Sequence, residues 1–392
     1  MSCENNYVEP ETLPNNLKIV SPENFSVFAR NSKIEYSALL DNDIDTSQVK
    51  CNLTWFSDED GIINRQKVLT PGKHKIIASM KCLETIFRDS VIIFISDSIG
   101  VPLVYTDKDW DIIKFNGDIY NMTLDIKDRI YLVSSEDGLY YFDRFKWKNY
   151  REEDGLYSNI LQSLFYNELE QKLYIGYGLN PGISTLKDES IEFIAMHDSL
   201  GGDVHAINFD QNNTLWAITH NGRLVYRDNS HWRTVEAQSG NFRNIHPQHI
   251  IFDENGLLWI FGDHSGGMIY NGTGFVHLAH RDFSDVAFYS SERKFLNNYG
   301  DAIYMYSPND TIIYKVDDER YGFGIALGKK GNIWVPHKNG LHKFNGDTWE
   351  KISITNFNPS GSAYRGQIAV DSKNNIWFVV HNYLFCYKGE SY

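Results

Sequence analysis

The sequence predicts an all-β protein, on three observations. Aromatic residues make up 14% of the 392-residue chain, and strands favour aromatic and β-branched side chains. Few stretches show the periodicity of an amphipathic helix. An aromatic anchor also recurs at intervals of 43, 42, 43, 36, 39 and 43 residues. The anchors are Tyr131, Tyr174, Trp216, Trp259, Phe295, Trp334 and Trp377. Such a period is typical of a repeat architecture in which each unit is one small supersecondary element.

Two segments precede the repeats. Residues 1–16 are polar, and we expect a flexible tether there. Residues 17–97 contain alternating runs such as KIEYSALL, VKCNLTWF and HKIIASMKC, separated by turn clusters such as SDEDG and TPGK. This pattern predicts an independent β-sandwich. The acidic run at 58–60 lacks the spacing of a calcium-binding loop, so we expect an ordinary hairpin turn.

The four cysteines are too few for a disulfide-dense scaffold and form no CxxC motif. By the period of two along a strand, Cys51 and Cys82 both point into the sandwich. A disulfide between them would require an oxidising compartment, and two buried free thiols are the alternative. If Met1 replaces a removed signal peptide, Cys3 resembles the lipidated first residue of a bacterial lipoprotein. The alternative is a frayed terminus with an incidental cysteine.

Residues 98–392 repeat one order of elements. An inner strand ends in a turn that often begins with Asp, six residues before the anchor, as at Asp125, Asp210, Asp253 and Asp371. An Asp side chain can accept a backbone N–H two residues on, so we interpret this as turn chemistry. The anchor strand, an Asn-Gly or Asp-Gly hairpin and two further strands follow. Four strands per unit predict the blades of a seven-bladed β-propeller.

The last unit, residues 366–389, has three strands, which would leave an exposed sheet edge. Residues 109–115, DWDIIKF, match the fourth strand of other units through Trp110. We expect this N-terminal strand to pair with the C-terminal strands and close the ring.

The repeats DQNNTLWAITHNGRLVY, DENGLLWIFGDHSGGMIY, KKGNIWVPHKNGLHKF and DSKNNIWFVVHNYLFCY resemble the propeller repeats in the periplasmic sensor regions of two-component regulators from Bacteroidetes. The stretches LTWFSDEDG and PGKHKI resemble bacterial immunoglobulin-like domains of the polycystic-kidney-disease type. These resemblances imply a location in the periplasm or on the outer-membrane surface. The chain carries fewer repeats than those sensors, so transmembrane signalling does not follow from the resemblance.

The net charge of the chain and the motifs that it lacks argue against several classes of function. The net charge of -14 opposes binding to nucleic acid or to anionic lipid. No apolar run is long enough for a spanning helix, and the GxSxG, HExxH, Walker and CxxC motifs are absent from the sequence. We therefore expect a monomer without a cofactor, associated with a membrane only through a possible lipid anchor.

Candidate site residues occupy two positions of the repeat. His220, Asp263 and His381 lie four residues after their anchors, and His264 and His337 lie one register away. All fall in the hairpin between the second and third strands, which shares a propeller face with the linkers between blades. The linker candidates are Tyr157, Asn159, Asp203, Arg243, Asn244, Asp285, Tyr321 and Arg365.

Such residues suit a polar ligand, because aromatic faces stack on sugar rings while polar groups fix orientation. We expect a non-enzymatic binding or sensing protein for a polysaccharide, an oligosaccharide or a protein ligand. One alternative is a metal-assisted lyase or hydrolase using His220, His264, His337 and His381, because streptogramin lyases are propellers with a His-dependent site. Two further hypotheses are a protein-assembly scaffold and hairpin residues that serve turn geometry alone.

Overall fold

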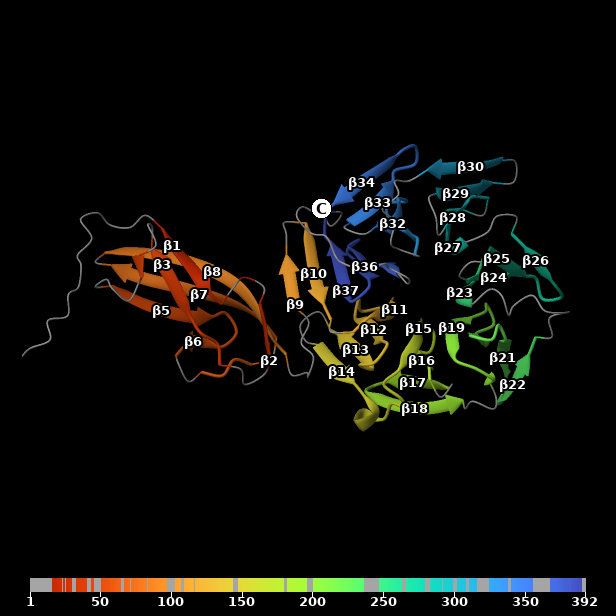
Figure 1. Cartoon of the computed structure of the whole chain (residues 1–392), viewed down its shortest axis with the longest axis horizontal. Coiled ribbons are helices and arrows are strands. Elements are labelled where there is room, and N and C mark those ends of the chain that lie inside the picture. The colour runs from red at the N-terminus through yellow and green to blue at the C-terminus, as the bar shows by residue number, and fades with distance from the viewer. Residues whose placement is uncertain are drawn as a thin grey trace, which may run out of the picture. The chain divides into compact units, whose positions relative to one another are not determined.

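The structure of the protein is a computed structural model. It describes residues 16–22, 24, 26–29, 33–40, 44–45, 51–64, 67–70, 72–82, 84–96, 103–106, 109–115, 117–143, 147–179, 182–195, 200–235, 247–262, 266–278, 283–290, 292–298, 302–307, 310–315, 324–337, 340–354 and 367–389. The chain divides into two compact units (Figure 1). The first comprises residues 1–106 with 145–148, and the second comprises residues 107–144 with 149–392. Cys3 lies outside the described residues.

The first unit holds two sheets, one of order β1-β3-β4 and one of order β2-β8-β7-β5-β6. Neighbouring strands are antiparallel except for β2 and β8, which are parallel. The strands are β1 (Leu17–Ser21), β2 (Val27–Ala29), β3 (Ser37–Leu40), β4 (Ile44–Asp45), β5 (Asn52–Ser57), β6 (Gly61–Ile63), β7 (Gly72–Cys82) and β8 (Thr85–Ser96).

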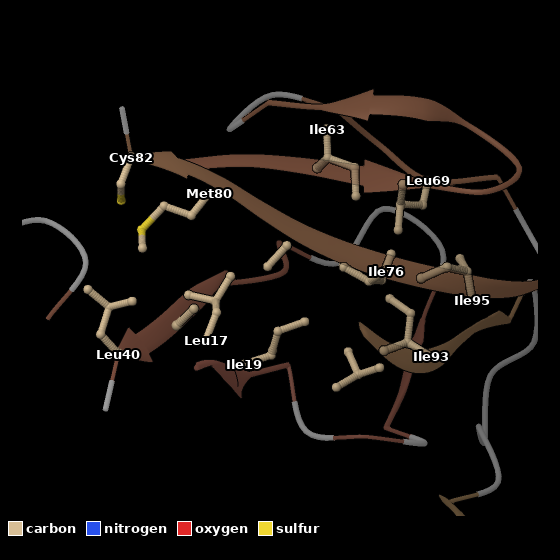
Figure 2. Packing of buried hydrophobic residues seen from close by; sticks show 13 residues of the cluster. Leu17, Ile19, Leu40, Ile63, Leu69, Ile76, Met80, Cys82, Ile93 and Ile95 are labelled. Atoms are coloured by element: carbon tan, nitrogen blue, oxygen red, sulfur yellow. The ribbon is translucent and has the colours of Figure 1, made fainter. Parts of the chain in front are cut away.

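The core of the first unit lies between these two sheets. Along β7, every second residue from His74 to Cys82 is buried, as the period of two in its sequence predicts. Ile76 and Met80 on this face belong to one cluster with Leu17 and Ile19 of β1 (Figure 2). Burial of each such side chain contributes about 1.5–3 kcal/mol.

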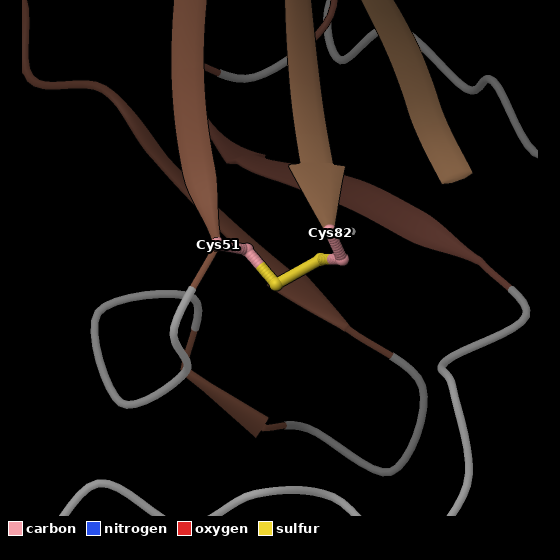
Figure 3. Close-up of a disulfide and its surroundings, with 2 residues drawn as sticks. All are labelled: Cys51 and Cys82. Carbon is pink, nitrogen blue, oxygen red and sulfur yellow. A yellow bond between two sulfur atoms is a disulfide. The ribbon is translucent and has the colours of Figure 1, made fainter. Parts of the chain in front are cut away.

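Cys51 and Cys82 form a disulfide (Figure 3). It joins the start of β5 to the end of β7, with a Cα–Cα distance of 4.7 Å and a sequence separation of 31. The two strands are already neighbours in the sheet, so the bond fastens one end of a backbone ladder. Of the two states that the sequence leaves open, the structure has the disulfide.

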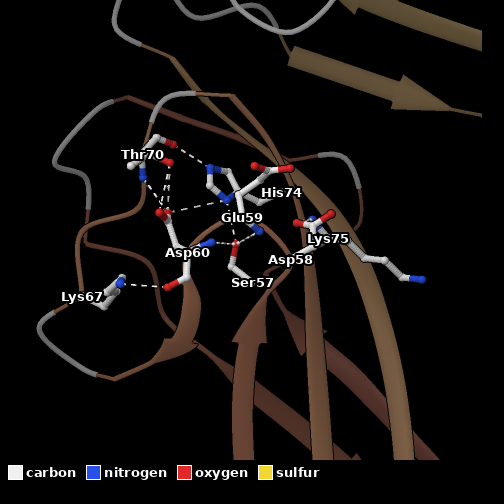
Figure 4. Close-up of polar contacts among 8 residues, drawn as sticks. All are labelled: Ser57, Asp58, Glu59, Asp60, Lys67, Thr70, His74 and Lys75. Carbon is white, nitrogen blue, oxygen red and sulfur yellow. Dashed lines mark hydrogen bonds and ion pairs between the residues drawn. The ribbon is translucent and has the colours of Figure 1, made fainter.

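The acidic run at 58–60 forms the turn between β5 and β6, as predicted (Figure 4). Its carboxylates accept hydrogen bonds from the protein. Asp60 Oδ2 accepts from the backbone N–H of Thr70 at 2.7 Å, and Asp58 Oδ1 accepts from that of Lys75 at 2.7 Å. These bonds fix the hairpin against the loop that leads into β7.

The second unit is a succession of antiparallel sheets; all but the last are built from four consecutive strands, and the last also takes in strands from an earlier part of the chain. The inner strands are β11 (Ile119–Leu124), β15 (Leu161–Asn167), β19 (Val204–Phe209), β23 (Pro247–Phe252), β27 (Phe283–Phe288), β31 (Ala326–Leu327) and β35 (Ile368–Val370). The second strands are β12 (Ile130–Ser134), β16 (Lys172–Tyr177), β20 (Leu215–Thr219), β24 (Leu258–Gly262), β28 (Lys294–Asn298), β32 (Ile333–His337) and β36 (Ile376–Val380).

The outer half of each sheet continues in the same order. The third strands are β13 (Leu139–Phe142), β17 (Ile183–Lys187), β21 (Leu224–Asp228), β25 (Gly266–Tyr270), β29 (Ala302–Ser307), β33 (Gly340–Phe344) and β37 (Tyr383–Tyr387). The fourth strands are β14 (Trp147–Tyr150), β18 (Ser190–Ala195), β22 (His231–Thr234), β26 (Phe275–His277), β30 (Asp310–Lys315) and β34 (Trp349–Ser353). A 3-10 helix, η3 (Glu152–Asp154), follows β14.

The sheets of the second unit form a ring (Figure 1). Each inner strand contacts the inner strand of the next sheet, and β35 contacts β11 at the junction between the last and first sheets. The last sheet is completed by β10 (Trp110–Lys114), which follows β9 (Leu103–Thr106) in the chain. Strand β10 pairs antiparallel with β37, with Trp110 opposite Tyr387. The predicted pairing of this segment with the C-terminal strands is therefore confirmed.

A buried Asp organises the turn after several inner strands. Asp253 Oδ1 accepts the backbone N–H groups of Asn255 and Leu257 at 3.0 and 2.9 Å, and its Oδ2 accepts Nε1 of Trp259 at 3.0 Å. The Asp210 and Asp371 carboxylates make the same set of bonds, and Asp125 accepts from the hydroxyl of Tyr131 in place of an indole. We call this arrangement the Asp clamp. The predicted turn chemistry is confirmed, and the carboxylate also positions the aromatic anchor.

The same turn bonds to the preceding sheet of the ring. Its fourth residue adopts a positive φ, with values of 60° at Asp128 and Asn213 and 65° at Asn374. Asn213 Nδ2 donates to Glu170 Oε1 at 2.9 Å, and Asp128 Oδ1 accepts the backbone N–H of Ser372 at 2.7 Å. The second of these bonds joins the first sheet to the last.

Within the described residues, no helix has the length and apolar character needed to cross a membrane.

Replacing Asp253 by Ala should lower the free energy of unfolding of the second unit by about 1–3 kcal/mol, because the buried indole N–H of Trp259 and two partly buried backbone N–H groups lose their acceptor. Asp228→Ala is the control, since Asp228 is exposed and its ion pair with Arg233 spans 3.5 Å. The control should change stability by less than about 0.5 kcal/mol. Urea unfolding of both variants measures the difference, and equal effects would refute the role of the Asp clamp.

The double variant Cys51→Ser/Cys82→Ser should destabilise the first unit by about 3–4 kcal/mol, because the bond closes a long loop in the unfolded chain. The second unit should unfold as in the unaltered protein. Calorimetry with and without a reductant measures the effect. A wild-type transition that is insensitive to the reductant would contradict the prediction.

Candidate functional site

The hairpins between second and third strands lie at the same end of the sheets as the linkers. The backbone N–H of His220 donates to the carbonyl of Asp203 at 2.8 Å, and that of Gly138 donates to Asn159 at 2.9 Å. The carbonyl of His381 accepts from Ile119, the first residue of β11, at 2.9 Å. These bonds confirm the predicted shared face, which we call the linker face.

His220 is the exposed member of a histidine pair on the linker face. It lies directly after β20, and its ring centroid is 4.9 Å from that of His205 on β19. His205 is buried, and its Nδ1 lies 2.9 Å from the carbonyl oxygen of Pro247. Because that carbonyl can only accept, Nδ1 of His205 is the donor. The next sheet therefore holds His205 in place, and His205 in turn supports the ring of His220.

Tyr157 forms an aromatic platform on the linker face. Its side chain is 52% exposed, although its ring stacks on Phe193 at 4.8 Å and meets Tyr177 edge-on at 5.9 Å. The hydroxyl of Tyr177 also accepts the backbone N–H of Tyr157 at 3.0 Å. An exposed ring that is fixed in advance loses little conformational entropy on binding a ligand.

Two candidate residues are engaged within the protein. Asn159 Oδ1 accepts from the backbone N–H of Glu152 at 2.9 Å, and Glu152 Oε1 accepts from that of Asn159 at 3.1 Å. This reciprocal pair closes the linker loop. His337 is fully buried, and its ring lies 4.7 Å from that of His342. It belongs to β32, in which all five residues are buried, so its ring packs in the sheet instead of facing solvent.

Asp285 belongs to a set of inner-strand side chains that bond from one sheet to the next, which we call the polar belt. Inner strands of neighbouring sheets do not share a backbone ladder, so side chains supply the polar contacts between them. The contacts are Ser163 Oγ to the carbonyl of Val204 at 2.7 Å, His205 Nδ1 to the carbonyl of Pro247 at 2.9 Å, His249 Nδ1 to Asp285 Oδ1 at 2.7 Å, and the backbone N–H of Ile325 to Asp285 Oδ2 at 3.0 Å.

Sequence reasoning missed Ser163, His205 and His249. A register shift marks the start of each strand that carries the belt, at 161–163, 204–206, 247–249 and 283–285. Such bulges redirect side chains. One feature of the sequence could have identified these residues. Each of the strands β15, β19, β23 and β27 has a polar residue or polar pair within its first three positions, namely QS, H, QH and SD in that order.

The remaining candidates divide into two groups. His381 adopts a φ of 55° in its hairpin, a conformation that His, Asn and Asp enter more readily than most residues. This supports the hypothesis that His381 serves the geometry of the hairpin turn. The candidates that lie outside the described residues are Asp263, His264, Arg243, Asn244, Tyr321 and Arg365.

Two of the candidate histidines lie in pairs, His220 with His205 and His337 with His342. Among the described residues, no group of three or more His, Cys, Asp or Glu side chains is arranged to hold a metal ion. A metal-assisted reaction would use such a set of ligands. His264, the fourth histidine of that hypothesis, is not among the described residues.

A ring of antiparallel sheets, four-stranded except for the five-stranded last one, with contacting inner strands has the architecture of the β-propeller class. Similar solved structures include virginiamycin B lyase from Staphylococcus aureus, with 13% identity and a TM-score of 0.57 over 73% of this chain and 97% of that one. Another is the extracellular domain of the putative one-component system BT4673 from B. thetaiotaomicron, with 15% identity and a TM-score of 0.55 over 71% and 40% of the two chains. YCF48 from Cyanidioschyzon merolae has 12% identity and a TM-score of 0.54 over 72% and 99%.

At these identities the likeness establishes the propeller fold alone. No protein-family model matches the sequence, and no curated protein matches it.

The His249–Asp285 pair predicts a pH-dependent stability. Burial alone would lower the pKa of His249, but the charge of Asp285 outweighs it and holds the pKa above its ordinary value. The pair therefore stabilises the fold fully below about pH 6.5, and this contribution declines as pH rises through the folded-state pKa.

His249→Gln should flatten the fall in unfolding free energy that begins as pH rises above about 6.5. His231→Gln, which alters an exposed residue of β22, should retain the wild-type slope. Urea unfolding across this pH range is the measurement. An unchanged slope in His249→Gln would remove the pair as the cause.

Proposed function

We propose that this protein is a non-enzymatic, extracytoplasmic binding or sensing protein. In this proposal an immunoglobulin-like sandwich is followed by a seven-bladed β-propeller, which the strand at residues 109–115 closes. The linker face of the propeller recognises a glycan or a protein. The observation that carries the proposal is the presence of Tyr157 and His220 on that face, each exposed and each supported from behind by a packed ring.

The chemistry of these residues suits a polar ligand. The face of Tyr157 offers a stacking surface for a sugar ring or for a peptide side chain. His220 and Asp203, whose backbones are bonded to each other, add hydrogen-bonding groups to the linker face. Supporting the ligand-contacting residues by packing reduces the entropy lost on binding.

Two observations support a place outside the cytoplasm. Disulfides persist in oxidising compartments, and the sandwich contains one. A similar propeller is the extracellular domain of BT4673. The proposal extends to an anchor at Cys3, with residues 1–16 as the tether. Metabolic labelling with a palmitate analogue in a bacterial host tests the anchor, and a Cys3→Ser variant that still incorporates the label would refute it.

Binding to the linker face can be tested with Tyr157→Ala and His220→Ala. Glycan-array and affinity-capture experiments first identify a ligand of the full chain. Each variant should then weaken that binding about tenfold, the change that a lost stacking or charged contact produces.

Leu169→Ala is the matched control. Leu169 is 82% exposed in the turn between β15 and β16, at the opposite end of the sheet, and its replacement should leave affinity unchanged. Wild-type affinity in both linker-face variants would exclude this face as the binding site. Turnover of a bound compound would favour the lyase or hydrolase hypothesis.

A further inference from the structure

A cavity of about 360 Å³ lies between the first two propeller sheets, β11–β14 and β15–β18. It is lined at the turns between β11 and β12, between β15 and β16, and between β17 and β18. In antiparallel sheets these turns lie at the end opposite to the linker face. The aromatic lining residues are Tyr131, Tyr141, Tyr150 and Tyr166.

The aromatic pair beside the cavity differs from the corresponding pair in the third sheet. In the third sheet the anchor is Trp216, whose indole meets Phe252 of the next inner strand at 5.7 Å. At the first junction the anchor is the smaller Tyr131, and it faces Tyr166 at 6.5 Å in a nearly parallel arrangement. A phenol ring fills less of the space than an indole, and Tyr166 adds a hydroxyl where Phe252 has none.

The Asp clamp of the first sheet holds a cationic group in the cavity wall. Asp125 Oδ1 accepts the backbone N–H of Arg129 at 3.0 Å, and Nε of the same residue donates to Asp125 Oδ2. Nη1 of Arg129 donates to the hydroxyl of Tyr141 at 3.4 Å, and the guanidinium carbon lies 5.8 Å from that ring centroid. These bonds fix a planar set of donors with known orientation.

The lining is polar but electrically balanced. Its charged residues are Lys127, Arg129, Lys187, Asp188 and Glu189. The buried Asp125 compensates Arg129, which leaves two cations and two anions. Burial, with the nearby Asp125 charge second, raises the pKa of Tyr131 and that of Tyr166. Both phenols therefore stay protonated and can donate as well as accept hydrogen bonds.

We propose that this cavity binds a neutral sugar residue, either free or at the end of an oligosaccharide. Tyr131, Tyr150 and Tyr166 are largely buried in the cavity wall and Tyr141 is partly exposed, so polar groups supply most of the surface that faces a ligand. Guanidinium, phenol and carboxylate groups match hydroxyls that both donate and accept. A charged ligand would disturb the balance of the lining, and a purely apolar one would bury polar groups without partners. The site is separate from the linker face, so the tests of sugar binding in this cavity and of ligand binding at the linker face have independent outcomes.

The central test is Tyr131→Trp in the full chain. At the other clamps an indole N–H donates to the Asp carboxylate, so Trp should satisfy Asp125 while its larger ring fills the cavity. Isothermal titration with glucose, galactose, mannose and N-acetylglucosamine should give a Kd on the order of 1 mM for at least one of them. Glucuronate and glucosamine are titrated as the charged comparison sugars. Tyr131→Trp should weaken that binding more than about tenfold without lowering Tm.

A matched pair of variants tests the hydrogen bonding. Tyr141 and Tyr226 occupy the same register, opposite Tyr131 and Trp216 respectively, but only Tyr141 lines the cavity. Tyr141→Phe removes a hydroxyl that orients Arg129 and should weaken sugar binding several-fold, whereas Tyr226→Phe should not change it.

A third variant separates binding from folding. Asp188 and Glu189 form the turn between β17 and β18 with φ values of 47° and 64°, a backbone that Asn-Gly adopts with less strain. Asp188→Asn/Glu189→Gly should therefore keep or raise Tm while weakening sugar binding. Absence of binding to all four sugars, binding confined to glucuronate or glucosamine, or unchanged affinity in Tyr131→Trp would each overturn the proposal.

Discussion

The Asp clamp, present in the turns at Asp125, Asp210, Asp253 and Asp371, is the contact on which the propeller unit most depends. In the Asp clamp a single side chain accepts two backbone N–H groups and the polar edge of the aromatic anchor. The turn that it fixes also places a left-handed residue where its side chain can reach the preceding sheet, as at Asn213 and Asp128. The clamp Asp therefore fixes the geometry of the turn, orients the aromatic anchor and places the residue that contacts the preceding sheet. Such coupling suits a ring in which each sheet packs only on its neighbours.

Polar groups near the inner strands are mostly committed to holding this ring together. The polar belt joins successive sheets through the hydrogen bonds of Ser163 and His205 and through the ion pair of His249 with Asp285. Residues that remain open to solvent on the linker face, such as Tyr157 and His220, are supported by the belt or by packed rings. The ring of sheets and its polar belt are thus rigid, and in the proposed function a few side chains on the linker face contact the ligand.

The first sheet shows how a repeat can acquire a site by departing from its own pattern. Replacing the indole anchor by Tyr131 leaves space, and placing Arg129 within reach of the clamp carboxylate lines that space with a fixed cationic group. Neither change disturbs the turn, because Asp125 keeps its backbone bonds. The fold tolerates such a substitution since the phenol still donates to the carboxylate at 3.3 Å.

The sequence by itself determined the strand order, the Asp turns, the anchor positions and the closing pair of β10 with β37, because each depends on local periodicity or on one strand matching another. Only the tertiary structure decided which polar side chains are buried and which partners they bond. His337 is buried, Asn159 closes a loop, and Asp285 pairs with His249. It also decided that Tyr131 leaves a cavity. Contacts between sheets join residues about 40 positions apart, and the volume left between two rings depends on both partners at once, which no local pattern records.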